Sequence, residues 1–522
     1  MALYEESAVS MVAALQSRAV SSEELVRALH ARADAVEGAV RGFTEQYRDA
    51  SLAAARQVDA ARARGDALGP LAGLPISVKE NFGLVGTPAT VGVRARLARK
   101  ATANSALVAT ALDAGCVILG KSNVPQLLLA IESHNDIWGT TYNPWNTGRV
   151  PGGSSGGEAA LIASGSSPAG LGTDIGGSIR NPAAWCGICG LKPTAGRWSM
   201  VGVAGGQPGQ EAIRGQAGPM ARTVADVVML MKALSPERQH ALDSLVPPIP
   251  FVDPTTVDLS KITVGYYEDD GIFTPAASVR RAVREAVEAL RAAGVKVVPY
   301  TPPRSWDMFE DYFGLLSADG FKTGLAVIEG EAITPQLKSV ARLGRLPSVV
   351  RKGLAQALGA AGESRVSRML GALGEKSVTR HWALVVLRNE LKQAEMAAWR
   401  EAGIDALVGP PTVTPAAIPG ETHDWSAGAW HTMRYNLLDL PAGVVPVSTV
   451  RDDEQVRGDL VDRLDKKAAR FEAGSAGLPV AAQIIARPWE EHIALAVMGA
   501  IEAGVSKAPG FPRTPVDPRG PR

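Results

Sequence analysis

The chain has little cysteine and no excess of charge of either sign. Its three cysteines, Cys116, Cys186 and Cys189, are an odd number and supply no disulfide framework. Cys186 and Cys189 have the spacing of a redox motif, but no thioredoxin-like sequence surrounds them, and we interpret them as packing residues. The 54 basic and 53 acidic residues leave a net charge of +1, which gives no electrostatic reason to expect a nucleic acid as a partner.

Long apolar runs and metal-binding patterns are also missing. Nowhere do about 18 apolar residues follow one another, so the sequence predicts no membrane-spanning helix. The first residues, 1–7, lack the basic and apolar regions of a secretory signal, and we expect a cytoplasmic protein. None of the seven histidines has a partner at metal-ligand spacing. We therefore expect no metal and no cofactor.

Short β-rich runs alternate with alanine-rich helical runs from Gly69 onward. The first of these are strand-like at Ile76–Val78, helix-like at Ser105–Ala114 and strand-like again at Cys116–Leu119. Such alternation is typical of an α/β fold. We therefore predict a mixed central β-sheet covered by helices on both faces, with helices over residues 10–63 before it.

The sequence contains no linker that is long enough to force a domain boundary. We predict one domain over residues 1–509, with a catalytic core at about 69–235 and a more variable, mainly helical region at about 300–400. Residues 510–522 are rich in proline, arginine and glycine, and we expect a loose C-terminal tail there.

Two loops rich in glycine and serine are the most informative segments. The first lies at Pro151–Glu158 and contains Ser154, and the second lies at Gly172–Pro182 and contains Ser178. Glycine lets a backbone approach a substrate closely or adopt a positive φ. A helix-like run and a strand-like run separate the two loops, so the chain can cross over and return the second loop beside the first.

A serine nucleophile in either loop needs a base other than histidine, because neither loop contains one. Lys79, at the end of the apolar run Leu74–Val78, is the candidate. Lowering a lysine pKa from about 10.4 to near 7 corresponds to roughly 4–5 kcal/mol, which burial can supply. Taken alone, such a lysine is typical of a surface and such a loop is typical of a flexible turn; together they favour a catalytic site.

With their flanking sequence, these segments resemble the amidase signature family, whose members use a Ser-cisSer-Lys triad. The resemblance covers Gly152–Thr194 almost without a gap. Further segments look like the fatty acid amide hydrolase branch of that family, namely Asn123–Gln126, Asn143–Trp145, Gly265–Glu268, Tyr435–Pro446 and Gly477–Gln483. The resemblance implies an amidase signature fold and a hydrolase that cleaves acyl amides, such as N-acylethanolamines or primary fatty amides, through an acyl-enzyme. We also expect a homodimer.

The triad of this family corresponds to Lys79, Ser154 and Ser178. We hypothesise that neutral Lys79 takes a proton from Ser154, which takes one from Ser178, and that Ser178 attacks the amide carbonyl. The resemblance also implies a cis peptide bond before Ser154. Backbone N–H groups of the second loop can converge on one point as an oxyanion hole, and the predicted donors are those of Ile175, Gly176, Gly177 and Ser178. Three side chains are interpreted as supporting residues, Ser155, Asp174 and Arg180.

The acyl side of the site is predicted between Lys121 and Trp145. By matching positions, Leu128, Leu129 and Ile131 stand where the fatty acid amide hydrolase branch has acyl-contacting residues; an ordinary apolar core stripe is the alternative. The stretch that corresponds to the hydrophobic membrane-docking cap of that branch, residues 346–373, carries several charged side chains here. Peripheral contact with a membrane and an ordinary solvated helix therefore both remain open.

Two motifs offer competing interpretations. Gly153–Gly157 matches G-x-S-x-G and would make Ser155 a nucleophile, but no strand precedes it, as that motif requires. Gly115–Ser122 matches the P-loop pattern, but a helix-like run precedes it and its middle residues are strand-like. We reject both interpretations.

Three rival functions remain open at this point. The first is a general amidase or esterase for small aliphatic or aryl amides. The second is an amidotransferase subunit, which would occur in an obligate complex. The third is a binding module without enzymatic activity, which covalent labelling of a serine would exclude.

Overall fold

The computed structural model describes residues 2–520 apart from Ser235, Glu329 and Asp459. Its main strands are β1 (Phe43–Gln46), β2 (Pro75–Lys79), β3 (Val117–Ser122), β6 (Ala169–Asp174), β7 (Cys189–Lys192), β8 (Gln216–Ala221), β9 (Thr263–Tyr266), β10 (Lys296–Pro299), β11 (Ala406–Gly409), β12 (Ala442–Thr449) and β13 (Pro479–Ala486). In the described part of the chain they form one 11-stranded sheet in the order β1-β3-β2-β6-β8-β7-β12-β13-β11-β9-β10. A separate short pair consists of β4 (His134–Asn135) and β5 (Gly139–Thr140).

The sheet is mixed, as predicted. Strand β2 runs parallel to β3 and β6, and β9 runs parallel to β10 and β11. The other neighbouring strands are antiparallel, including the β6–β8 pair in which Asp174 lies opposite Gln216. Parallel neighbours bring their carboxyl ends to one edge of a sheet, and this places the loop after β2 beside the loop after β6.

The helices of the sequence follow and flank these strands. Those before residue 300 are α1 (Ala8–Gln16), α2 (Ser22–Val40), α3 (Arg48–Arg64), α4 (Ala106–Asp113), α5 (Gly156–Ser164), α6 (Arg180–Cys186), α7 (Val224–Ala233), α8 (Pro236–Leu242) and α9 (Ala277–Ala292). Those after it are α10 (Ser305–Leu316), α11 (Lys322–Val327), α12 (Pro335–Arg345), α13 (Ser348–Ala360), α14 (Ser364–Ala372), α15 (Val378–Ala402), α16 (Trp430–Leu437), α17 (Arg463–Glu472) and α18 (Glu491–Val505).

Helices cover both faces of the sheet, again as predicted. Val444 of β12 packs in a cluster with residues of α5 and α6. The next residue back along β12, Gly443, faces Met498 of α18. Because successive strand residues point to opposite faces, α6 and α18 lie on opposite faces of the sheet.

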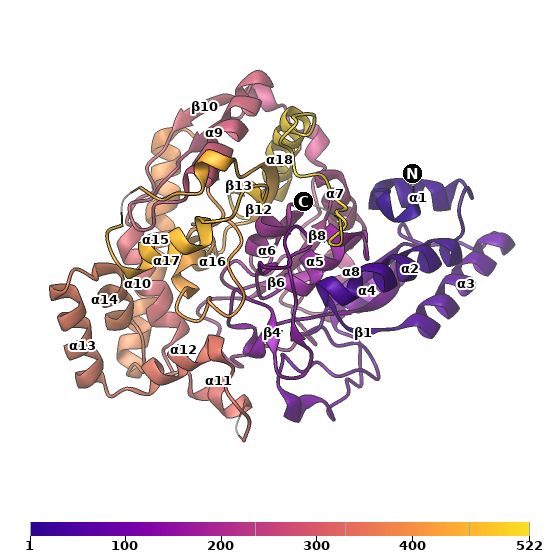
Figure 1. The fold of residues 1–522 in the computed structure, drawn as a ribbon. Helices are drawn as coiled ribbons and strands as arrows, with labels where there is room; N and C mark the ends of the chain where they lie inside the picture. Colours follow the sequence, from indigo (N-terminus) through magenta and orange to yellow (C-terminus); the bar gives the residue numbers. More distant parts are fainter. Residues whose placement is uncertain (1, 235, 329, 459, 521–522) are drawn as a thin grey trace.

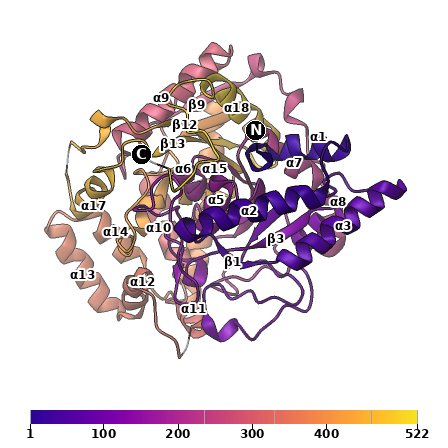
Figure 2. The ribbon, with the colours of Figure 1, turned by 45° about the vertical axis from the view of Figure 1, so that its right-hand side comes forward.

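Two groups of helices lie at the sides of this core. Figures 1 and 2 show α1, α2 and α3 together on one side and α11 to α14 on the other. The second group belongs to the mainly helical stretch that the sequence predicts at about 300–400. The chain between α2 and α3 forms strand β1, which the sequence pattern misses because the pattern over residues 10–63 indicates helices only. Strand β1 is four residues long and is held by antiparallel pairing with β3, a contact that no local pattern reveals.

The segment predicted as a loose tail contacts the rest of the molecule over residues 511–517. The Val516 N–H donates to the Ala163 oxygen at the end of α5 (2.9 Å), and Asp517 lies 3.3 Å from Arg32. Phe511 packs against the main hydrophobic core. The last two residues of the tail, 521–522, lie outside the described residues.

Candidate active site

Lys79 is the last residue of β2, and its side chain is fully buried. Its Nζ lies 2.8 Å from Ser154 Oγ. The same nitrogen lies 3.1 Å from the backbone oxygen and 2.9 Å from the hydroxyl of Thr173, on the neighbouring strand β6. The structure therefore brings Lys79 and Ser154 into direct contact, and it adds Thr173, which the sequence did not single out.

Burial lowers the pKa of Lys79 to about 7. The largest cause is the loss of hydration, which disfavours the charged ammonium. The carboxylates of Asp174, Glu158 and Glu80 act in the opposite direction without offsetting it. At neutral pH a large fraction of this amine is uncharged, and only that form can accept a proton.

Ser154 and Ser178 come from different loops that meet in space. The peptide bond between Gly153 and Ser154 is cis, as the family resemblance implies. The Ser155 N–H donates to the backbone oxygen of Ser178 (3.0 Å), and this hydrogen bond links the two loops. Ser154 and Ser178 both line one cavity of about 490 Å³. Among the described residues, the Ser178 hydroxyl has no hydrogen-bond partner, so it is free to contact a molecule in the cavity.

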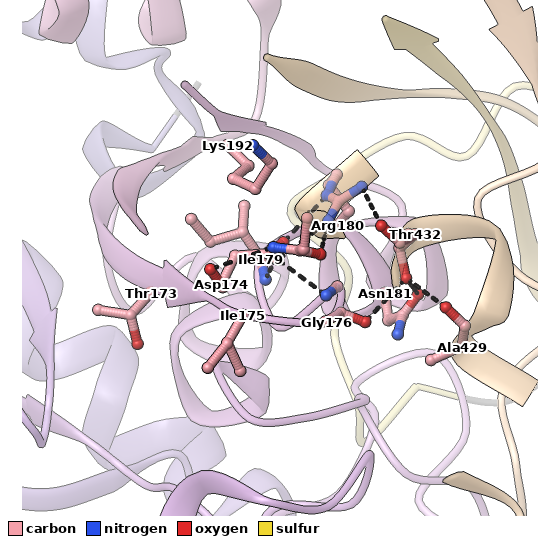
Figure 3. Close-up of polar contacts among 12 residues, drawn as sticks. Thr173, Asp174, Ile175, Gly176, Ile179, Arg180, Asn181, Lys192, Ala429 and Thr432 are labelled. Atoms are coloured by element: carbon pink, nitrogen blue, oxygen red, sulfur yellow. Dashed lines mark hydrogen bonds and ion pairs between the residues drawn. The ribbon is translucent and has the colours of Figure 1, made fainter. Parts of the chain in front are cut away.

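The loop after β6 is built around a buried ion pair between Asp174 and Arg180 (Figure 3). Arg180 Nε and Nη2 donate to the two carboxylate oxygens at 3.0 and 2.9 Å. The same carboxylate accepts the N–H groups of Gly177 (2.7 Å) and Ile179 (3.1 Å). Burial alone would raise the pKa of Asp174, but the charge and hydrogen bonds of Arg180 hold that pKa well below its usual range. Both side chains are therefore engaged with each other and with the backbone of the loop, and neither faces the cavity as a free charge.

The predicted oxyanion hole needs one correction. The Gly177 N–H is occupied by Asp174 Oδ1 and is not available to a substrate. The N–H groups of Ile175, Gly176 and Ser178 have no acceptor within the described part of the chain. They remain candidates for the donors of an oxyanion hole.

Side chains from two helices that are distant in the sequence contact this loop, and they leave no room for a Cβ at Gly176 or Gly177. A Cβ at Gly176 would overlap the hydroxyl of Tyr312 on α10, whose Oη donates to the Ile175 oxygen (3.1 Å). Gly177 has a φ of +114° and faces the hydroxyl of Thr432 on α16, which donates to the Gly176 oxygen (3.0 Å). Figure 3 shows Thr432 beside the loop. Neither Tyr312 nor Thr432 carries a local sequence signal, since both reach the loop from far along the chain.

The structure also bears on the two competing motifs. Ser155 is fully buried, and its hydroxyl donates to the backbone oxygen of Thr173 (3.2 Å). It is therefore not exposed to the cavity, as a nucleophile would have to be. The P-loop match falls on strand β3, and its lysine, Lys121, is buried and donates to the Pro88 oxygen (2.7 Å). No helix opens directly after the pattern in the described chain, as phosphate binding requires.

A second cavity, of about 420 Å³, meets the first at Ser178 and is mainly apolar. Leu128, Leu129 and Ile131 all line it, as does Gly176 of the loop. Its far wall comes from α10, α13 and α14 and includes Phe313, Leu354, Leu358, Val366 and Met369. The sequence did not identify the residues of this far wall, because their apolar spacing is that of any amphipathic helix.

Comparisons with known proteins identify the family of the chain. The family model for amidases matches residues 24–495. The chain belongs to the amidase family. It is an amide hydrolase, which the similarity to fatty acid amide hydrolases and other amidases supports along nearly its whole length.

Several relatives indicate where in the family the chain lies. It is 37% identical to fatty-acid amide hydrolase 1 of Sus scrofa over 83% of this chain and 76% of the relative, and 33% identical to fatty acid amide hydrolase 1 of Caenorhabditis elegans over 84% and 77%. A solved fatty acid amide hydrolase superposes with a TM-score of 0.83 at 26% identity, covering 97% of this chain and 86% of that one. The chain is also 36% identical to a glutamyl-tRNA(Gln) amidotransferase subunit of Chloroflexus aggregans, over 65% of this chain and 70% of the relative.

In the part of the chain that the structure describes, no helix combines the length and the apolar character needed to cross a bilayer.

Proposed function

We propose that the protein is a serine hydrolase of long-chain acyl amides that works through a Lys79–Ser154–Ser178 relay. The observation that carries the proposal is the 2.8 Å contact between a buried lysine amine and Ser154, beside the unpartnered hydroxyl of Ser178. The names of the relatives support the amide class, and the apolar cavity beside Ser178 supports a long acyl chain.

The relay moves one proton at each step. Neutral Lys79 accepts the proton of Ser154, and Ser154 accepts the proton of Ser178 as the Ser178 oxygen attacks the amide carbonyl. The N–H groups of the loop after β6 stabilise the oxyanion that develops. Collapse of this intermediate breaks the C–N bond while Ser154 gives a proton to the leaving nitrogen. Water then attacks the acyl-enzyme by the same relay and releases the carboxylic acid.

The two cavities take the two halves of the substrate. Ser154 borders the 490 Å³ cavity but not the 420 Å³ cavity, whereas Ser178 borders both. Since Ser154 protonates the leaving nitrogen, the amine half occupies the first cavity, and the acyl half occupies the second. An apolar cavity of this size is within the usual range for a ligand-binding site, and each methylene buried in it contributes about 0.8 kcal/mol.

The amidotransferase alternative is supported by one group of relatives. The small, polar side chain of glutamine would leave the apolar acyl cavity largely empty, so we favour a fatty acyl group.

Hydrolysis of a fatty acyl ethanolamide by the purified protein tests the proposal, with release of the free acid as the readout. We expect turnover by the native chain, none by Ser178→Ala, and a measurable fraction by Ser155→Ala, the matched serine one position from the relay. No turnover of any acyl amide by the native chain would refute the proposal.

A further inference from the structure

The cavity on the amine side of the site contains one cation. Among the described residues that line it, Arg214 is the only lysine or arginine. Arg214 lies two residues before Gln216, which pairs with Asp174 at the start of the loop that carries Ser178. Two residues of extended chain span roughly 7 Å, so the long arginine side chain starts close to the proposed reaction centre.

The guanidinium of Arg214 is only weakly engaged by the protein. Its Nη2 lies 3.3 Å from the Ala195 oxygen and 3.4 Å from Asp439 Oδ2, both at the long limit for a hydrogen bond. Its Nε and Nη1 donate to no atom of the described residues. The side chain is 44% exposed, and an arginine carries its charge at any physiological pH.

Asp439 does not neutralise Arg214, because two other cations already share its charge. Arg388 lies 2.6 Å and Lys392 lies 2.5 Å from the same oxygen, Oδ2, that Arg214 approaches at 3.4 Å. One carboxylate thus faces three cations, and the longest of the three contacts is the one made by Arg214. The cluster has an excess of positive charge, and the exposed member of it faces the cavity.

Two carboxylates besides Asp174 border the same cavity. Asp243 accepts hydrogen bonds from the Ser199 hydroxyl (2.7 Å) and the Leu245 N–H (3.0 Å), so its oxygens are already occupied. Glu211 is exposed, and no ion pair joins it to Arg214 in the described structure. Neither carboxylate therefore takes up the free donors of the guanidinium.

We propose that Arg214 binds a carboxylate on the amine half of the substrate, so that N-acyl amino acids are substrates of this enzyme. The inference rests on the proposed function, because it needs the amine half to occupy this cavity. Two of the guanidinium donors that lack a protein partner, on Nε and Nη1, are available to carboxylate oxygens, and such charge-assisted hydrogen bonds are stronger than neutral ones. The amide bond broken is the same as before, and the product is the free amino acid instead of ethanolamine.

The test compares two substrates that differ only in the amine, N-dodecanoylglycine and N-dodecanoylethanolamine. We expect the native chain to hydrolyse both. We expect Arg214→Gln to lower the ratio of kcat/KM for the glycine conjugate over that for the ethanolamide by about ten-fold or more, mainly through KM, as loss of a charge-assisted bond implies. Arg214→Lys keeps the charge and should retain part of the preference. Arg64→Gln, an exposed arginine on α3, is the matched control and should leave the ratio unchanged.

The outcomes separate this inference from the function on which it rests. If the ethanolamide is hydrolysed and the glycine conjugate is not, or if the ratio is the same in Arg214→Gln as in the native chain, the role of Arg214 is refuted and the proposed function stands. If the native chain hydrolyses neither substrate, the proposed function itself is refuted.

Discussion

At the residue scale, the proposed relay depends on the surroundings of one amine, that of Lys79. All three hydrogen-bond partners of Lys79 Nζ are neutral groups, belonging to Ser154 and Thr173. No carboxylate of the described chain touches it directly, so burial dominates and the ammonium is disfavoured. A direct ion pair in this position would have kept the lysine charged and unable to act as a base.

The pH dependence of turnover follows from this amine. The pKa of Lys79 is lowered to about 7, so the neutral base is the main form above that pH and is lost as the pH falls through it. We predict that kcat/KM for a neutral acyl amide falls about ten-fold per pH unit on the acid side of this value, and that Lys79→Met lowers it by at least about 10² above this value. A pH–rate profile checks both. A rate that does not change between about pH 5 and 9 would contradict the role of Lys79.

A second buried residue, Glu158, is predicted to fix the position of α5 relative to strands β2 and β3. It lies in the first turn of α5, just after the Ser154 loop, and its carboxylate accepts the hydroxyls of Ser77 on β2 and Ser122 on β3 (2.6 Å for Ser122). Burial raises the pKa of Glu158 to about 7. A Cβ at Gly170 of β6 would overlap this carboxylate, so the glycine leaves the space that Glu158 occupies.

We predict that Glu158→Ala lowers the free energy of unfolding by about 3 kcal/mol, because it leaves two buried hydroxyls without a partner and opens a cavity. Glu158→Gln, which keeps the shape and can still bond both serines, should cost about 1 kcal/mol. Urea unfolding of the two variants measures the difference. Equal stability of the two would show that the hydrogen bonds of Glu158 contribute nothing.

At the element scale, the loop after β6 is positioned by contacts from helices that are remote in sequence. Its backbone is fixed from inside by Asp174 and from outside by Tyr312 and Thr432. Gly177→Ala would place a Cβ against the Thr432 hydroxyl at a φ that disfavours any side chain. We predict that this variant loses at least about 1 kcal/mol of stability and about 10²-fold in kcat, because the N–H donors of the loop are displaced.

Thermal unfolding and steady-state kinetics of Gly177→Ala measure these two effects. Gly38→Ala on α2 is the matched control, since its added methyl group meets no atom within 4 Å. If both variants behave alike, the conformation of the loop is not critical.

The elements around the site are largely predictable from sequence, and their contacts are not. Strand β6 lies where the sequence predicts a strand-like run between the two loops, and Lys79 and Ser154 are candidates that follow from motifs. Thr173 and Tyr312 do not stand out, because threonine and tyrosine are common and their roles arise from the packing of distant elements. The prediction of Gly177 as an oxyanion donor is wrong because the pattern shows which backbone is free of side chains, but not which N–H groups are already bonded. Strand β1 escapes prediction for a similar reason, since its pairing with β3 is a tertiary contact.

At the scale of the whole molecule, the apolar cavity lies between the loops that follow β3 and β6 and the helical region of residues 300–400. Its near wall comes from Leu128, Leu129 and Ile131 and its far wall from α10, α13 and α14. With the amine held constant, we predict that kcat/KM rises about three- to four-fold for each added methylene until the cavity is filled, and then levels off. Rates for a series of N-acylethanolamines from acetyl to palmitoyl measure this. A series in which the shortest chains are hydrolysed best would favour a general small-amide hydrolase.

The expected homodimer stays a prediction at this scale. Sedimentation velocity of the purified chain measures its mass in solution, and a monomer at all concentrations would show that the expectation is wrong.

Mapping the site of covalent labelling by a fluorophosphonate tests the central claim most directly, because this reagent traps an activated serine. The account predicts a single adduct on Ser178, a labelling rate that falls as the pH drops below about 7, and a loss of at least about 10² in that rate in Lys79→Met. An adduct on Ser155, or labelling of Ser178 that is as fast in Lys79→Met as in the native chain, would contradict it.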